Sequence, residues 1–173
     1  PHGVTNRMEL RVVVDPISSE VETPHEITSR AQEIDYPIVV SGSITTAGEV
    51  DLYAIDVDQP GPLFLEVRPS RGALAKKFRP SIEVFTHHET FFDPERLTRV
   101  AFNDRAEGSE KIVMDKDPRE RESIPVPLEW EVTEAGRYFV RIASLGGWGA
   151  PEYVYQLHIV PAANRTRIDE PEE

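Results

Sequence analysis

The sequence predicts an all-β protein, an antiparallel β-sandwich of jelly-roll type with about eight strands. Short segments of alternating apolar and polar residues recur along the chain, and this alternation is typical of strands that bury one face. Glycine and proline residues that favour turns separate these segments, as in residues 59–62 and 134–136. No convincing helical periodicity accompanies them, which favours a β-sandwich over helical or mixed classes.

Eight segments carry the strand pattern. We expect strands over residues 38–44, 50–57, 63–67, 81–86, 97–103, 127–132, 137–143 and 153–160. In residues 50–57, Asp51 falls on the same face as Tyr53, while Leu52 and Ala54 fall on the other. Because both faces carry apolar residues, this strand is expected at the centre of a sheet.

The chain is interpreted as one domain with extensions at both ends. Residues 1–36 are expected to form an N-terminal extension with a short strand at 8–14, a linker or flap from residue 17, and a helical turn near 28–33. Residues 37–161 form the predicted sandwich, and residues 162–173 an acidic, disordered tail. A basic loop at 68–79 is expected to pair with a charged insertion at 104–124.

The composition excludes several function classes. The 173 residues include 31 acidic and 19 basic ones, a formal net charge of -12 that disfavours nucleic acid as a partner. No apolar run approaches the roughly 18 residues of a membrane-spanning helix, so membrane insertion is not expected. Cysteine is absent, which removes disulfides, zinc–thiolate sites and thiol nucleophiles. Since the chain opens at Pro1 without an initiator methionine, we expect a piece of a longer product.

The common catalytic and transition-metal motifs are missing. The chain contains no Gly-x-Ser-x-Gly elbow, no P-loop and no dinucleotide-binding fingerprint, so an enzyme is not expected. The adjacent His87 and His88 would point to opposite faces of a strand, and His2, His25 and His158 lack the spacing of helical zinc motifs. The histidine pattern therefore predicts no transition-metal site.

Several ordered motifs resemble the bacterial pre-peptidase C-terminal (PPC) domain. They are Gly42-x-Ile44, Gly48–Tyr53, Asn103-Asp104, Ala135–Ile142 and Tyr155-x-Leu157, preceded by an acidic lead-in at residues 20–26. The resemblance implies a jelly-roll sandwich without catalysis of its own, secreted or located at the cell envelope. Such domains flank exported enzymes, and some bind polymers such as collagen. Some carry calcium between the acidic lead-in and the Asp-x-Tyr strand. His25 departs from that pattern, which favours asparagine at its position.

The candidate cofactor is therefore calcium, with acidic residues of the lead-in and of the first turn as ligands. The predicted set is Glu20, Glu22, Glu26, Ser43, Glu49 and Asp51, with Ser43 taking part if the lead-in folds back over that turn. Ca²⁺ takes six to eight oxygen ligands, which such a set could supply. The alternative is that these are exposed carboxylates beside a turn. Asp51 also has a structural interpretation, in which it accepts backbone N–H bonds and fixes the turn at Gly48.

Trp148 and Tyr153 are the candidate ligand-binding residues. Trp148 lies in the glycine-rich loop 146–151, where an exposed indole would stack on a sugar ring or anchor a partner. The alternative is a tryptophan that folds back over the end of the sandwich. Trp130 alternates with Leu128 and Val132 and is expected in the core.

The function that these observations favour is a non-catalytic accessory domain of an exported bacterial protein. It would bind a polymer substrate, or space and assemble neighbouring domains of a larger chain. A carbohydrate-binding module that uses Trp148 is the first alternative, and a purely structural or assembly module is the second. The sequence gives no oligomeric state.

Overall fold

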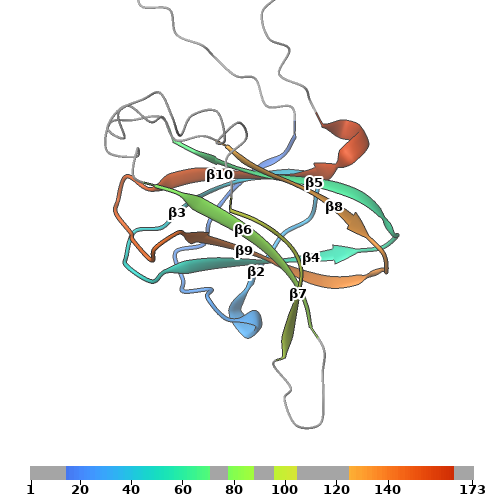
Figure 1. Ribbon diagram of the computed structural model, residues 1–173, viewed down its shortest axis with the longest axis horizontal. Coiled ribbons are helices and arrows are strands. Elements are labelled where there is room, and N and C mark those ends of the chain that lie inside the picture. The colour runs from blue at the N-terminus through green and yellow to red at the C-terminus, as the bar shows by residue number, and fades with distance from the viewer. Residues whose placement is uncertain (1–14, 71–77, 88–95, 105–124, 166–173) are drawn as a thin grey trace, which may run out of the picture.

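The computed structural model describes residues 15–70, 78–87, 96–104 and 125–165, and it confirms the predicted all-β sandwich. Two five-stranded sheets pack face to face and form the two layers seen in Figure 1. The strands are β1 (Ile17–Ser19), β2 (Gln32–Glu33), β3 (Ile38–Ser43), β4 (Val50–Val57), β5 (Gly61–Pro69), β6 (Pro80–His87), β7 (Leu97–Asn103), β8 (Val126–Val132), β9 (Gly136–Ser144) and β10 (Val154–Pro161). The described residues also include the 3-10 helices η1 (Thr28–Arg30) and η4 (Ala162–Asn164).

The two sheets have related strand orders. The first sheet runs β1-β3-β10-β5-β8, and the second runs β2-β4-β9-β6-β7. Neighbouring strands are antiparallel except for β1 with β3 and β2 with β4, which are parallel. The sandwich is therefore antiparallel in its body and acquires one short parallel strand at an edge of each sheet.

The core lies between the sheets and follows the predicted alternation. In β4, Tyr53, Ile55 and Val57 point into it together with Asp51, while Leu52 and Ala54 face outward and pack on Phe139. A second row of the core comes from β8, where Trp130 is buried as expected and meets Tyr138 edge to face at 4.8 Å. Burial of apolar residues on both faces fits the position of β4, which is second in the sheet, between the two-residue strand β2 and the central strand β9.

The N-terminal segment differs from the linker that the sequence predicts. Residues 17–19 pair with β3 and residues 32–33 pair with β4, so the segment joins both sheets and raises the strand number to ten. The expected helical turn is the 3-10 helix η1. An edge strand needs only backbone hydrogen bonds to its neighbour, so a polar sequence can supply it. The predicted strand at residues 8–14 lies outside the described residues.

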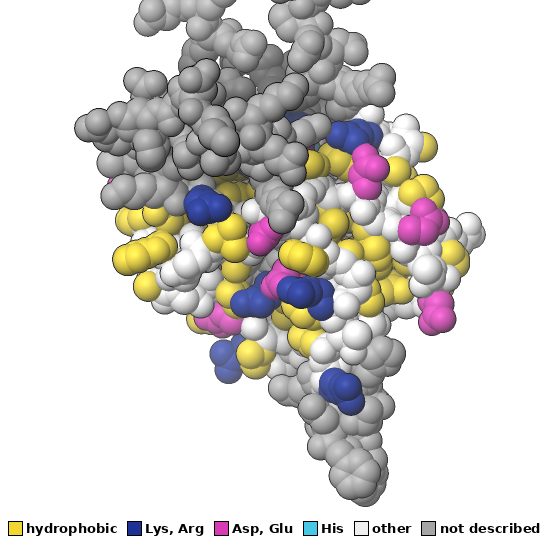
Figure 2. Space-filling view, in the orientation of Figure 1, with side chains coloured by type: hydrophobic (Ala, Val, Ile, Leu, Met, Phe, Trp, Pro, Cys, Tyr) yellow, Lys and Arg dark blue, Asp and Glu magenta, His cyan; other side chains and the backbone are white. Residues whose placement is uncertain are grey.

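Charged side chains on the outside of the second sheet pair with one another. Glu83 on β6 accepts hydrogen bonds from Arg99 at 2.6 Å and from Arg141 at 2.8 Å. On the face shown in Figure 2, the described acidic and basic side chains are interspersed with apolar ones and do not gather into a patch of one sign. The predicted pairing of the basic loop with the insertion falls mostly on residues 71–77 and 105–124, outside the described part of the chain. Of that loop, Arg68 pairs with Glu66.

Candidate functional site

The site is built where the N-terminal segment crosses from one sheet to the other. The crossing runs from β1, at the edge of the first sheet, to β2, at the edge of the second. The Gln32 side chain closes it, because Oε1 accepts the Val21 N–H at 2.9 Å and Nε2 donates to the Ser19 carbonyl at 3.0 Å. The Leu52 N–H donates to the His25 carbonyl at 3.2 Å. The crossing is therefore closed on itself by Gln32 and attached to β4 at His25.

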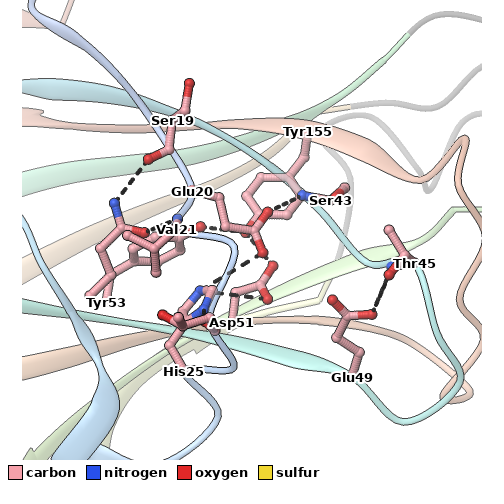
Figure 3. Close-up of polar contacts among 12 residues, drawn as sticks. Ser19, Glu20, Val21, His25, Ser43, Thr45, Glu49, Asp51, Tyr53 and Tyr155 are labelled. Atoms are coloured by element: carbon pink, nitrogen blue, oxygen red, sulfur yellow. Dashed lines mark hydrogen bonds and ion pairs between the residues drawn. The ribbon is translucent and has the colours of Figure 1, made fainter.

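Three potential ligands meet below this crossing (Figure 3): Glu20 and His25 from the crossing and Asp51 from β4. One ligand atom from each lies within 4.8 Å of the other two. The Nε2 atom of His25 is 3.7 Å from Oδ1 of Asp51 and 4.0 Å from Oε1 of Glu20. The exposed fractions of His25 and Asp51 are 3% and 1%, while Glu20 is only partly buried. We call these three residues the Glu20–His25–Asp51 cluster.

In each of the three side chains, the polar atom that does not face the other two side chains is held by a separate partner. Oε2 of Glu20 accepts the Ser43 N–H at 2.7 Å, and Oδ2 of Asp51 accepts the Tyr155 hydroxyl at 2.5 Å. Nδ1 of His25 lies 3.1 Å from the Thr23 carbonyl oxygen. Because a carbonyl can only accept, Nδ1 carries the proton, and the lone pair of the neutral ring is then on Nε2.

The atoms left over are Oε1, Nε2 and Oδ1, which face one another. Among the described residues, Nε2 of His25 has no hydrogen-bond partner, although it is buried. Such an atom loses its hydration without compensation, which costs free energy unless something else fills the position. A cation is the species that would satisfy a lone pair and two carboxylate oxygens at once.

The pKa shifts of the surrounding acidic groups also favour a cation at this position. Burial raises the pKa of the Asp51 carboxyl to about 8, and the nearby negative charge of Glu20 adds to the rise, while the Tyr155 hydrogen bond opposes it. Burial also raises the pKa of Glu20. The hydroxyls of Tyr155 and Tyr53 are 2.7 Å apart, and burial raises the pKa of both, so they remain neutral donors beside the cluster. The site lacks positive charge where two acidic groups converge.

A glycine makes this arrangement possible. A Cβ atom on Gly42 of β3 would lie 2.5 Å from the hydroxyl oxygen of Tyr155 and 3.0 Å from Oε2 of Glu20. Only a residue without a side chain leaves room for both groups. The glycine of the Gly42-x-Ile44 pattern is therefore required by close packing beside the cluster.

The structure brings only part of the predicted calcium set together. Glu20 and Asp51 lie in the cluster, and Ser43 reaches it through its backbone N–H (Figure 3). Glu22 and Glu26 are on the crossing with exposed side chains.

Glu49 points away from the cluster and toward the turn (Figure 3). Its Oε2 accepts the backbone N–H and hydroxyl groups of both Thr45 and Thr46, at 2.6 to 3.0 Å. The turn-fixing role expected of Asp51 is thus performed by Glu49, while the Asp51 carboxylate accepts a tyrosine hydroxyl instead.

His25 is the member of the cluster that the sequence reasoning left out. Histidine pairs that bind metal on a helix or as neighbours have a defined spacing, and His25 has neither spacing. Two signals were available: Asp51 alternates with Tyr53 and so should face the core, and His25 interrupts an acidic lead-in. Neither signal shows that the lead-in crosses directly over Asp51.

The glycine-rich loop presents Trp148 to solvent. The indole is 68% exposed, so it does not fold back over the end of the sandwich. Gly146 and Gly147 adopt φ angles of +83° and +69°, which favour glycine, and the Gly48 N–H donates to the Gly147 carbonyl at 3.0 Å. A Cβ on Gly149 would lie 2.1 Å from the backbone carbonyl oxygen of Thr46, so the two loops are in close contact.

Tyr153, the other predicted ligand-binding residue, lies in the core instead. Its ring is buried and stacks on Phe78, with 5.0 Å between the ring centroids. An aromatic ring covered in this way cannot stack on a ligand from solvent. The prediction of a surface-binding residue therefore rests on Trp148 alone.

Comparison with known proteins gives a fold and no family. No protein-family model and no curated protein matches the chain. One similar solved structure is the pre-peptidase C-terminal domain of collagenase from Bacillus anthracis, with 13% identity over 75% of this chain and 93% of that one, and a TM-score of 0.46. Another is CorA, a surface-associated copper-binding protein of Methylomicrobium album BG8. It is 6% identical over 76% of this chain and 98% of that one, with a TM-score of 0.50. At these identities the second likeness shows a shared β-sandwich fold only.

Within the described residues, none of the helices is both long and apolar enough to span a bilayer.

Proposed function

We propose that this chain is a non-catalytic accessory β-sandwich domain of an exported protein, and that it binds a divalent metal ion under its N-terminal crossing. The observation that carries the proposal is the buried Nε2 atom of His25, which has no hydrogen-bond partner among the described residues and faces carboxylate oxygens of Glu20 and Asp51. Sites where several ligand atoms converge and no positive charge balances the acidic groups favour cations. The resemblance to PPC domains supports the exported location and the accessory role.

Three divalent ions are candidates for the site. Calcium is the cation that the PPC resemblance implies, and CorA, with the same general fold, is described as copper-binding. Both ions are therefore part of the test, together with zinc. The ion would hold the N-terminal crossing onto the sandwich, because Glu20 and His25 belong to the crossing and Asp51 to β4.

Thermal unfolding after treatment with a chelator tests this proposal. A cation that binds only the folded state raises the midpoint by an amount that grows with its concentration above Kd. We expect at least one of Ca²⁺, Zn²⁺ and Cu²⁺ to raise the midpoint with a stoichiometry of one ion per chain in calorimetric titration. If none of the three binds stoichiometrically, the metal-binding proposal is wrong.

A second candidate function is contact with a polymer through Trp148. The exposed indole stands on a loop that close contacts with Thr46 and Gly48 hold in place, and such fixed aromatic side chains stack on sugar rings. Trp148→Ala should abolish any retardation of the protein in polysaccharide gels and leave its unfolding midpoint unchanged, because the side chain is exposed. Retardation that persists in the variant would assign the contact elsewhere, and a protein that is never retarded favours a structural or assembly role.

A further inference from the structure

We infer that the ion held by the Glu20–His25–Asp51 cluster is a first-row transition ion of the Zn²⁺ or Cu²⁺ kind, bound by three protein ligands with one position left open. This inference rests on the proposed metal-binding function and names the class of ion. The ligand atoms are Nε2 of His25, Oε1 of Glu20 and Oδ1 of Asp51.

The donor set argues against calcium. Ca²⁺ takes six to eight oxygen ligands, and the cluster offers two carboxylates and an imidazole nitrogen. Glu49, which would have enlarged the oxygen set, has its Oε2 engaged by Thr45 and Thr46. Mixed imidazole and carboxylate ligands suit zinc and copper, and a buried histidine has no role in a calcium site.

The spacing of the ligand atoms also fits a small ion. With metal–ligand bonds of about 2.0–2.2 Å, two ligands of a tetrahedral centre lie roughly 3.4 Å apart. Nε2 of His25 is 3.7 Å from the Asp51 oxygen and 4.0 Å from the Glu20 oxygen. The two distances from Nε2 exceed this value by about 0.3 Å and 0.6 Å, and the ligand atoms of all three residues lie within 4.8 Å of one another, so side-chain rotations would bring them to bonding positions around a small ion.

The hydrogen bonds behind the ligands are those expected of a prepared site (Figure 3). Metal-binding histidines commonly donate their second ring N–H to a carbonyl, and metal-binding carboxylates are themselves hydrogen-bonded. Here Thr23, Ser43 and Tyr155 take these places, one for each ligand, and each leaves the ligand atom facing the centre. Each ligand side chain is thus oriented by its own hydrogen-bond partner. A chance cluster of acidic side chains would not be oriented in this way.

Three protein ligands leave a fourth position for water or an external donor. Closed structural zinc sites use four protein ligands, whereas open sites keep one exchangeable position. Glu20 is the most exposed of the three ligands, with 17% of its side chain accessible to solvent, so the external ligand approaches from its side. The geometry thus points to an ion that can exchange its outer ligand while the protein holds it.

Cobalt substitution followed by competition tests the inference directly. After chelation, Co²⁺ should bind one to one and give the intense visible absorption of a four-coordinate centre, and Zn²⁺ should displace it. Ca²⁺ in large excess should leave the spectrum unchanged. Cu²⁺ should show electron paramagnetic resonance splitting from a single nitrogen.

Matched variants locate the site. His25→Gln and Glu20→Gln should each remove the cobalt spectrum, whereas Glu22→Gln and Glu26→Gln, which alter exposed carboxylates of the same segment, should retain wild-type affinity. Tyr155→Phe should weaken zinc binding about 10- to 100-fold through Asp51, as loss of an outer hydrogen bond does. A cooperative unfolding transition in chelator confirms that each variant is folded. If His25→Gln does not fold, Glu20→Gln alone tests the ligand assignment.

The outcomes separate this inference from the function on which it rests. Calcium binding that depends on Glu22 or Glu26, without a four-coordinate cobalt spectrum, overturns the inference and keeps the metal-binding function. A copper or cobalt signal that survives in both His25→Gln and Glu20→Gln assigns it to other residues and also overturns the inference. If no ion binds, both the inference and the proposed metal-binding function are wrong.

Discussion

Replacing Asp51 with asparagine removes a buried acidic group and keeps its shape. The side-chain oxygen of the asparagine can still accept the Tyr155 hydroxyl, which bonds Oδ2 of Asp51 at 2.5 Å. Its amide nitrogen then takes the place of Oδ1, which lies 3.7 Å from the unpartnered Nε2 of His25. The substitution therefore supplies a permanent donor at the position where the ionised wild-type carboxylate offers the Nε2 atom only a second acceptor.

The expected gain in the metal-free protein follows from the pKa. Burial raises the pKa of Asp51 from 3.8 to about 8. A carboxyl with a raised pKa destabilises the folded state increasingly as pH rises from the unfolded value to the folded one. At about 1.4 kcal/mol per pH unit, this amounts to as much as about 4 kcal/mol at pH 7. Asp51→Asn abolishes this cost, so the variant should unfold at a higher temperature than the wild type when both are in chelator.

The assay is thermal unfolding of both proteins in chelator from pH 4 to pH 8. The difference between their midpoints should be near zero at pH 4 and should grow as pH rises toward 8. At pH 7 it should reach as much as roughly 8–16 °C, since 1 kcal/mol corresponds to about 2–4 °C in a chain of this size. The order should reverse when a saturating metal ion is present, because the variant has lost a ligand. A midpoint for Asp51→Asn at or below that of the chelated wild type at pH 7 would show that Asp51 is ionised and stabilising, and would refute this reasoning.

Three further substitutions test the surroundings of the site and the core. Gly42→Ala should cost about 1–3 kcal/mol and weaken metal binding, because its methyl group would displace the Tyr155 hydroxyl; unchanged zinc affinity would contradict this. Glu49→Ala should cost about 1–2 kcal/mol by freeing the turn and should leave zinc affinity unaltered, and a loss of binding in calorimetry would return Glu49 to the ligand set. Trp130→Ala should cost about 3–5 kcal/mol in denaturant unfolding because it empties the space beside Tyr138, and a cost below 1 kcal/mol would exclude that packing.

Strands whose side chains alternate could be predicted from the sequence closely. The predicted strands at 50–57 and 97–103 coincide with β4 and β7, and the others agree within a few residues at each end. The same alternation placed Asp51 on the face of Tyr53, which the structure shows to be the core face. These features are local, because the alternation that identifies a strand depends only on consecutive residues.

The short strands β1 and β2 could not be predicted in this way. They contain three and two residues, and no side chain in either of them is fully buried. Backbone hydrogen bonds to β3 and β4 hold them, and such bonds leave no trace in the side-chain pattern. The sequence of this segment therefore predicts a linker, and only its position at the two sheet edges shows that it contains strands.

The sequence by itself determined the sandwich, its acidic balance, and that Glu20 and Asp51 were candidate ligands. The tertiary structure decided which groups meet: it brought Tyr155 to Asp51 across 104 residues, buried Tyr153, exposed Trp148 and added His25 to the cluster. The reason is physical. Burial of one strand face depends on neighbours along the chain, whereas a site at the junction of two sheets depends on how a polar segment crosses between them, and that path is fixed by contacts with both.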